Sequence, residues 1–138
     1  MNSNQIGLMA ELKFQTLAIS KNLKISAPVC ASSRYDFIVD NGINLLKVQV
    51  KSTKTERKRK NTVAYEVALC GGDRMTKYRS DEVDMFCIYL EALDIWYVLP
   101  AKKVKDIKYI TLFPNSEDSK YDVYKDAWDL FYNPDNKE

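Results

Sequence analysis

The stretch from Arg34 to Thr53 constrains the fold more than any other part of the sequence. Apolar and polar residues alternate on both sides of Asp40, Asn41 and Gly42, which together form a turn signal. Alternation with a period of two is typical of strands that have one buried face. The stretch therefore predicts two antiparallel strands joined by a tight turn.

The length of the turn decides which side chains of this hairpin share a face. A two-residue loop places Asp36 opposite Lys47 and diagonal to Gln49, whereas a four-residue loop places Asp36 opposite Gln49 itself. Both lengths put Asp36, Gln49 and Lys51 on one face, because strand side chains alternate. A three-residue loop would put them on opposite faces. The prediction of a shared face thus depends on a loop of two or four residues.

An acid, an amide and a lysine on one face of an apolar hairpin have two interpretations. The face is either simply solvated or a metal-dependent phosphodiesterase site. Ile38 and Leu45 share the face and favour partial burial over solvation. Carboxylate and amide oxygens are hard ligands that suit Mg²⁺. A lysine beside them can stabilise phosphate charge or help to activate water.

The same residues resemble the motif of the PD-(D/E)XK nuclease superfamily, in which an acid on one strand precedes a polar-x-Lys sequence on the next. Here Asp36 is the acid, and Gln49 and Lys51 form the second part. Glu11 matches the glutamate that precedes such a hairpin on the first helix of related nucleases. Within the superfamily, the chain resembles the group I intron homing endonucleases of this type from cyanobacteria. The likeness covers Gly7 to Pro100.

Two positions depart from the family pattern. Tyr35 stands where a proline is usual before the acid, and Gln49 stands where a second acid is usual. A glutamine does occur at this second position in parts of the superfamily. It removes one negative charge from the site, which makes Glu11 more important as a ligand.

The resemblance implies a restriction-endonuclease-like α/β fold, with a mixed central sheet flanked by helices, and Mg²⁺-dependent hydrolysis of double-stranded DNA. Mn²⁺ or Ca²⁺ would substitute for Mg²⁺ in binding. The implied metal ligands are Asp36, Glu11, Gln49 through its side-chain oxygen, and Val50 through its backbone carbonyl. The implied catalytic residues are Glu11, Asp36, Gln49 and Lys51. In this set Gln49 ligates the metal or orients water, and Lys51 stabilises developing charge and favours deprotonation of the water.

The resemblance also bears on assembly and on rival functions. One site cuts one strand, so a double-strand cut implies at least a dimer, and the relatives suggest a tetramer. One rival is another nuclease of the superfamily, such as a junction resolvase or a restriction enzyme, which would differ in its DNA substrate. The other rival is a non-catalytic DNA-binding module, with Gln49 as the sign of a degenerate site.

Composition bounds the remaining possibilities. The 138 residues are expected to form one nuclease domain, 1–138, and their apolar content of 46 % is ordinary for a globular fold. Histidine is absent, which excludes Ser-His-Asp and Cys-His catalysis and any His-ligated zinc site.

Cys30, Cys70 and Cys87 lie in apolar runs without metal-binding spacing, so we expect reduced core thiols and a cytoplasmic protein. By resemblance, the setting is a prokaryotic cell and its nucleoid. No apolar run approaches the length of about 18 residues that a membrane helix requires, so we expect no membrane insertion.

Positive charge is concentrated in one segment, although the net charge is only +2. Residues 51–60 alone carry a net charge of +5, which leaves −3 for the rest of the chain. We expect a basic DNA-contacting segment at about residues 53–61, which forms either a loop or the mobile end of a long hairpin into the next strand. The functional alternatives are a solubilising loop or a localisation signal. The predicted DNA contacts are Arg34 before the hairpin, Lys54, Arg57, Lys58, Arg59 and Lys60 in the loop, and Arg74, Lys77 and Arg79 in a weaker cluster beyond it. Arg34 has a second interpretation of equal weight, in which it lies at the rim of the site and does not contact a phosphate.

The rest of the pattern predicts a helix, several strands and a terminal helix. The first helix is capped by Asn2, Ser3 or Asn4, runs to about Asn22, and has a buried stripe of Leu8, Met9, Leu12, Thr16, Ile19 and Leu23. Further strands are expected at Lys24–Cys30, Thr62–Cys70, Val83–Leu90, Ile95–Leu99 and Tyr109–Phe113. A short helix is expected from Ala101 to Val104, a terminal helix from Tyr121 to Phe131, and a frayed tail from Asn133 to Glu138.

Overall fold

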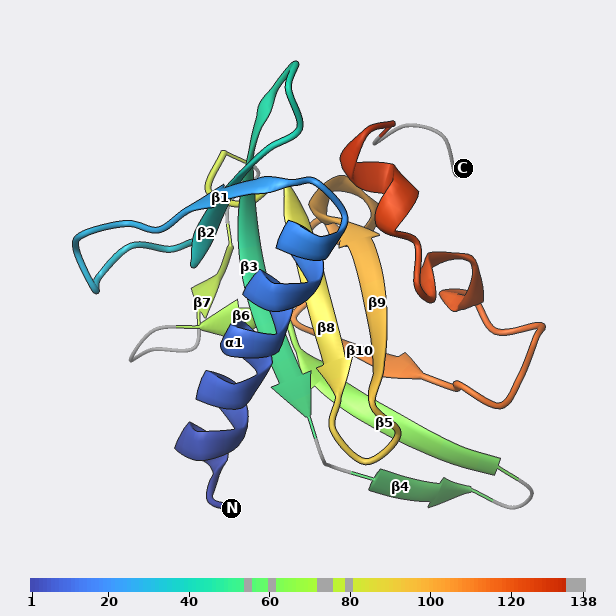
Figure 1. The fold of residues 1–138 in the computed structure, drawn as a ribbon. Coiled ribbons are helices and arrows are strands. Elements are labelled where there is room, and N and C mark those ends of the chain that lie inside the picture. Colours follow the sequence, from blue (N-terminus) through green and yellow to red (C-terminus); the bar gives the residue numbers. More distant parts are fainter. Residues whose placement is uncertain (54–55, 60–61, 72–75, 79–80, 134–138) are drawn as a thin grey trace.

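The computed structural model describes residues 1–53, 56–59, 62–71, 76–78 and 81–133. A five-stranded sheet lies at the centre (Figure 1), with the strand order β1-β2-β3-β8-β9. Its strands are β1 (Lys24–Ser26), β2 (Phe37–Asp40), β3 (Leu45–Thr53), β8 (Met85–Leu90) and β9 (Ile95–Pro100). β3 pairs antiparallel with β2 and parallel with β8, so the sheet is mixed, as predicted.

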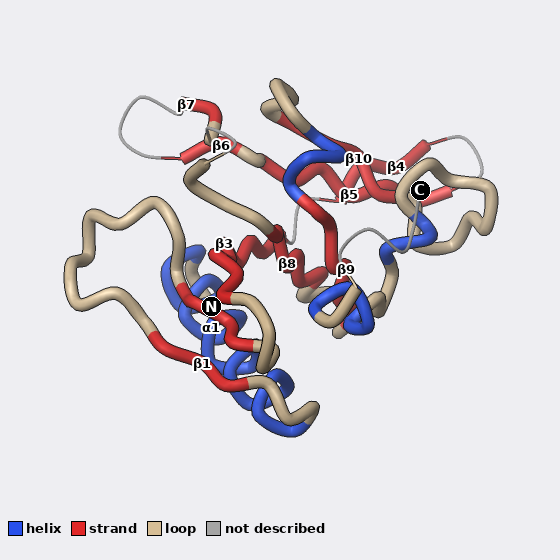
Figure 2. Tube along the Cα trace, turned by 90° about the horizontal axis from the view of Figure 1, so that it is seen from above, coloured by secondary structure: helices blue, strands red, loops and turns tan. Residues whose placement is uncertain are grey.

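The central sheet is covered on both faces. Helix α1 (Ser3–Ser20) packs across one face, and a smaller sheet lies beyond the other (Figure 2). This second sheet has the order β10-β5-β4, with β10 at Tyr109–Leu112, β5 at Thr62–Ala68 and β4 at Glu56–Arg59. A two-stranded piece, β6 (Cys70–Gly71) and β7 (Thr76–Lys77), lies on the same side. No helix in the described part of the chain is long and apolar enough to cross a membrane.

The hairpin of β2 and β3 has the four-residue loop that the sequence allowed. Phe37 lies opposite Val48 and Asp40 lies opposite Leu45, so residues 41–44 form the connection. The Asn41 side chain accepts hydrogen bonds from the backbone N–H groups of residues 43 and 44, and Asp40 accepts from that of Gly42. Gly42 adopts a φ of +91°, which a residue with a Cβ rarely adopts. The prediction of a loop with an even number of residues is confirmed.

The first predicted strand is too long. It pairs with β2 only from Lys24 to Ser26, and the predicted continuation to Cys30 is wrong. The partner strand β2 starts at Phe37, so little of it remains to pair beyond Ser26. Pro28 also has no N–H group to donate. Because Cys30 lies in the turn that follows, its expected burial is wrong as well, whereas Cys70 and Cys87 are buried as predicted.

Helix α1 begins with a capping box but buries a different stripe from the one predicted. Asn2 and Gln5 exchange side-chain and backbone hydrogen bonds at 2.9 Å, which satisfies two N-terminal N–H groups. Leu8, Leu12 and Ile19, all predicted to be buried, are exposed at 58 %, 55 % and 63 %. The residues that face the sheet instead are Ile6, Ala10, Phe14 and Ala18, and Leu23 just beyond the helix is buried as predicted.

The aromatic side chain of Phe14 accounts for this rotation of the helix. Its ring stacks on Phe37 at a centroid distance of 5.4 Å and on Trp128 at 6.0 Å, with Trp96 and Phe131 at its other edges. The small side chains of Ala10 and Ala18 let the helix approach the sheet closely on either side of this cluster. The orientation of the helix therefore buries Phe14 among four aromatic rings and leaves the side chains of Leu8, Leu12 and Ile19 exposed.

The C-terminal segment forms two short 3₁₀ helices in place of the predicted single helix. They are η2 (Asp122–Tyr124) and η3 (Trp128–Phe131), and a third 3₁₀ helix, η1 (Ala101–Val104), lies where a short helix was expected. Between η2 and η3, Lys125 forms an isolated β-bridge with Tyr97, and the Asp126 N–H donates to the Trp96 carbonyl at 2.8 Å. Asp126 has a φ of +53°, so no helix could pass through it. Residues 125 and 126 thus pair with the edge strand β9 and do not continue the helix that was predicted.

Of the two forms expected for the basic segment at residues 53–61, the described residues form the hairpin and not the loop. Thr53 is the last residue of β3, and Glu56–Arg59 forms β4, which pairs antiparallel with β5. The expectation of a loop relied on the absence of apolar side chains from this segment. An edge strand needs none, because its backbone groups pair with the neighbouring strand. Residues 54–55 and 60–61 lie outside the described part.

Candidate active site

Asp36 is anchored to β3 at the point where β2 begins. Its backbone N–H donates to the Val48 carbonyl at 2.8 Å, and its carboxylate Oδ2 accepts from the Val50 N–H at 2.8 Å. Phe37 lies opposite Val48, so continuing the antiparallel register by one residue places Asp36 opposite Gln49. Lys51 is two residues further along β3, so the three side chains emerge on one face.

Glu11 reaches this group from α1. The helix packs directly on β3. Because β2 starts only at Phe37, no strand of the described residues pairs with β3 on this side beyond Asp36, which leaves the edge open. Burial raises the pKa of Glu11, and the nearby carboxylate of Asp36 raises it further. The two carboxylates therefore lie close enough to repel each other.

Asp36 and Lys51 attract each other, in contrast to the two carboxylates, and each favours the charged form of the other. Burial raises the pKa of Asp36, while the Val50 N–H and the Lys51 ammonium both act to lower it. Burial lowers the pKa of Lys51, and Arg34 lowers it further, while Asp36 and Cys70 act to raise it. The Lys51 ammonium donates to the Cys70 carbonyl at 3.0 Å. The partly buried Lys51 ammonium is thus attracted by the partly buried Asp36 carboxylate.

The oxygen donors of the site fit a hard divalent cation. Two repelling carboxylates, Glu11 and Asp36, favour a bound positive charge. The Gln49 amide nitrogen Nε2 donates to the Val50 carbonyl oxygen at 3.5 Å, so the side chain and the carbonyl named as ligands are neighbours. Among the described residues, no three His, Cys, Asp or Glu side chains form a metal-binding group. This follows from Gln49, which stands where a third carboxylate would be.

Tyr78 is a member of this region that the sequence did not reveal. Its ring lies 5.0 Å from the Lys51 ammonium and 4.2 Å from the Arg34 guanidinium. Burial, with a smaller contribution from Asp36, raises the pKa of Tyr78 to about 12, so the phenol stays protonated. Tyr78 comes from a polar segment with no strand or helix pattern. It reaches the site because β7 pairs with β6, Cys70 opposite Lys77.

Arg34 is held within the protein next to Tyr78. Its guanidinium donates to the Gly71 carbonyl at 3.1 Å and forms an ion pair with Glu82 at 3.1 Å. Both partners of that ion pair are largely buried. The phosphate contact expected for Arg34 stays a prediction, and the observed contacts give this side chain a place beside Lys51.

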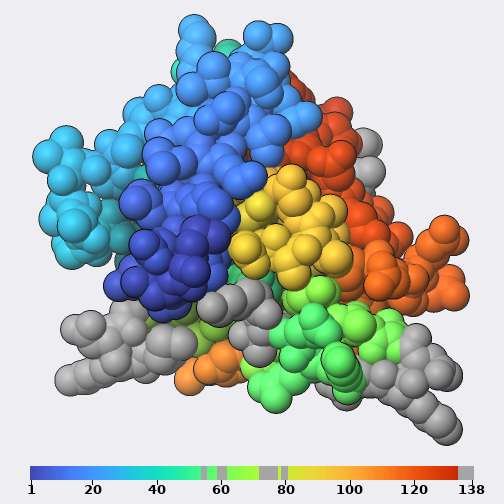
Figure 3. Space-filling model, turned by 60° about the horizontal axis from the view of Figure 1, so that its bottom comes forward, coloured from blue at the N-terminus to red at the C-terminus, as the bar shows by residue number. Residues whose placement is uncertain are grey.

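The predicted DNA contacts lie mainly on β4 and around β7. Arg57 and Lys58 are exposed on β4, where Arg57 also lies 3.6 Å from the Glu66 carboxylate. Figure 3 shows β4, in green, at the surface next to the yellow turn between β8 and β9. Of Arg59 and Lys77 only the backbone is described, and Lys54, Lys60, Arg74 and Arg79 lie outside the described residues.

A helix carboxylate and a strand lysine that both interact with Asp36, at the open edge of a mixed sheet, are features of a nuclease of the restriction-endonuclease-like class. The family model described as PD-(D/E)XK endonuclease matches residues 1–130, and the chain belongs to this family. The predicted resemblance is therefore confirmed, and the chain is an endonuclease.

The solved structures add a particular likeness. The chain is similar to a bacterial homing endonuclease, I-Ssp6803I, with 25 % sequence identity and a TM-score of 0.79. The match covers 100 % of this chain and 99 % of that one. No curated protein sequence matches the chain.

Proposed function

We propose that this endonuclease cleaves double-stranded DNA at specific sites in a Mg²⁺-dependent reaction, as a homing endonuclease. The observation that carries the proposal is the convergence of Glu11 and Lys51 on Asp36, whose carboxylate acts electrostatically on both of them. The similarity to I-Ssp6803I along the whole chain supports the homing class over the other nucleases of the superfamily.

In this proposal Glu11, Asp36, the Gln49 side-chain oxygen and the Val50 carbonyl hold the metal. The bound ion would polarise the scissile phosphate and make water a stronger nucleophile. The Val50 N–H holds Asp36 by one carboxylate oxygen, which leaves the other oxygen available as a ligand. Glu11 approaches from a separate element, so the two carboxylates can bind from different sides.

Lys51 has the role of stabilising negative charge. Its ammonium lies on the face that carries Asp36, so a phosphate bound there would meet it directly. Partial burial strengthens its attraction for phosphate oxygens, because water screens the charge less. Its pKa is lowered by burial, and a proton held less tightly is also more easily exchanged with the attacking water or the leaving group.

The ribbon of β4 and β5 would bind the DNA beside the site. Arg57 and Lys58 project from an edge strand, and a two-stranded ribbon fits the major groove. β4 follows β3 after only two residues, so groove contacts would set the position of the scissile phosphate relative to Lys51. Since each site cuts one strand, we propose that the active form is a dimer or a tetramer.

The test compares Asp36→Asn with Asp40→Asn on a supercoiled plasmid library that carries long random inserts. Asp40 is a matched control at the other end of β2, and an asparagine there keeps an oxygen for the turn at Gly42. The wild type and Asp40→Asn should produce ends at a few defined insert sequences with Mg²⁺ and none with EDTA, and Asp36→Asn should produce none.

Three results would speak against the proposal. Cleavage that persists in EDTA would exclude the metal dependence. Binding without any Mg²⁺-dependent cut would indicate the non-catalytic module. Preference for four-way junctions over linear duplex, measured on matched oligonucleotides, would indicate a junction resolvase.

A further inference from the structure

We infer that Tyr78 is a positioning residue for Lys51, and that its aromatic ring, rather than its hydroxyl, holds the ammonium on the face shared with Asp36. The inference rests on the proposed role of Lys51 in cleavage. Tyr78 itself touches neither of the carboxylates in any described contact and would act through the lysine.

Two cations meet at the Tyr78 ring. Arg34 lies 4.2 Å and Lys51 lies 5.0 Å from its centroid, and the charge of Arg34 acts against that of Lys51. Two like charges this close would otherwise separate, and the lysine is the one with a flexible, unbranched side chain. The negative potential of the ring faces attracts both cations and offsets their repulsion. The Cys70 carbonyl adds a directional hydrogen bond to Lys51 at 3.0 Å.

Other contacts fix the ring in place. Phe86 meets it edge to face at a centroid distance of 5.6 Å. Gly71 lies on another side, where an added Cβ would come within 2.5 Å of the Tyr78 hydroxyl oxygen and 3.6 Å of the Lys51 nitrogen. A residue with a Cβ at position 71 would therefore displace the Tyr78 hydroxyl, whereas its distance to the Lys51 nitrogen is that of an ordinary contact. Arg34 is itself held by Glu82 and the Gly71 carbonyl, so the support does not depend on the lysine.

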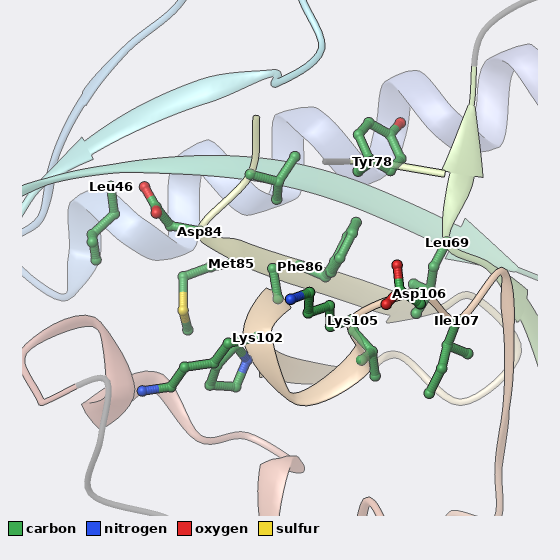
Figure 4. Close-up of a pocket in the computed structure, with 14 residues that line it drawn as sticks. Leu46, Leu69, Tyr78, Asp84, Met85, Phe86, Lys102, Lys105, Asp106 and Ile107 are labelled. Carbon is green, nitrogen blue, oxygen red and sulfur yellow. The ribbon is translucent and has the colours of Figure 1, made fainter. Parts of the chain in front are cut away.

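One side of the ring is less tightly packed. Tyr78 borders a cavity of about 440 Å³ between β8 and η1, whose wall also includes Phe86 and Leu69 (Figure 4). Lys51 and Asp36 do not line this cavity. A smaller residue at position 78 would open a path from the cavity toward Lys51 and let the ammonium leave the site. The ring thus separates the charged site from the apolar cavity.

The test uses Tyr78→Phe, which keeps the ring, and Tyr78→Leu, which removes it. Tyr132→Leu is the matched control, because that tyrosine is exposed and contacts only the Lys21 carbonyl in any described hydrogen bond. We expect Tyr78→Phe and Tyr132→Leu to cleave at close to the wild-type single-turnover rate. Tyr78→Leu should be slower by about 10-fold to 100-fold, as for a misplaced catalytic group, with unchanged DNA affinity in EDTA.

A measurement in the free protein needs neither activity nor a disruptive variant. The ring should shift the NMR signals of the Lys51 side-chain Hε protons upfield, and Tyr78→Phe should keep this shift. Unshifted Hε signals in the wild type would overturn the inference. So would an equal rate loss in Tyr78→Phe and Tyr78→Leu, or a loss of DNA affinity as large as the loss of rate. If Lys51→Ala cleaves as fast as the wild type, the proposed role of Lys51 fails instead, whatever Tyr78 does.

Discussion

Replacing Lys51 with methionine separates a catalytic role from a structural one. Methionine has a similar length and no charge, so the substitution removes the ammonium and keeps most of the packing. The folded protein loses the hydrogen bond to the Cys70 carbonyl, a charge-assisted bond of about 1.5–3 kcal/mol. It also loses the unfavourable burial of the ammonium, which is the main reason that the pKa of Lys51 is lowered. These two effects oppose each other, and we expect the free energy of unfolding to change by no more than about 1 kcal/mol.

Catalysis should respond far more strongly. Removing one group that stabilises developing charge typically lowers the rate by about 10²–10³-fold, or about 2.7–4 kcal/mol of transition-state stabilisation. Urea unfolding would give the stability, and single-turnover cleavage with Mg²⁺ would give the rate. The matched control is Lys47→Met, since Lys47 lies on the same strand and also donates to a backbone carbonyl, that of Asp81.

Two results would refute this reasoning. A rate for Lys51→Met equal to that of Lys47→Met would mean that the lysine has no part in the chemistry. A fall in stability of more than about 2 kcal/mol would mean that the lysine serves mainly to hold β3 and β6 together, since the loss would then match that of an uncompensated hydrogen bond.

Three further predictions concern the metal, the DNA and the core. The raised pKa of Glu11 means that the folded state binds its proton more tightly than the unfolded state, so wild-type stability should fall as pH rises above about 4.5 in EDTA. Glu11→Gln should reduce this fall, to which Asp36 also contributes because burial raises its pKa. It should also remove most of the stabilisation by Mg²⁺ in thermal unfolding, and a normal Mg²⁺ effect in this variant would exclude Glu11 as a ligand. Replacing Arg57 and Lys58 with alanine should reduce the salt dependence of log K for duplex binding by about 0.9 per lost phosphate contact, whereas Lys105→Ala should leave the slope unchanged. Phe14→Ala should lower the free energy of unfolding by about 3–5 kcal/mol in urea titrations, and a loss below about 1 kcal/mol would show that the aromatic cluster is not the centre of the core.

The hairpin was predictable because its evidence is local. Alternation of apolar and polar residues marked both strands, and Asn41 and Gly42 marked the turn. Once the loop has four residues, the pairing of Asp36 with Gln49 follows from the geometry of an antiparallel sheet. The family motif could then be recognised, since it consists of residues on these two strands and one helix.

The buried face of α1 and the form of the basic segment were not predictable in the same way. Leu8, Leu12 and Ile19 form an acceptable helical stripe, yet the helix turns Phe14 toward an aromatic cluster built from β2, β9 and η3. Residues 56–59 contain no apolar side chain, yet they form β4 because β5 offers backbone partners. The first outcome depends on partners that are distant in sequence, whereas β4 and β5 follow one another along the chain, with Arg59 opposite Thr62.

The amino-acid order alone determined the hairpin and the motif residues, because alternation along each strand sets which of its side chains share a face. The structure then fixed the length of the loop at four residues. Only the tertiary structure decided that Glu11 lies near Asp36 and that Tyr78 lies near Lys51. The first contact depends on where β2 begins, and the second depends on the pairing of β6 with β7. Both bring together segments that no local sequence pattern relates.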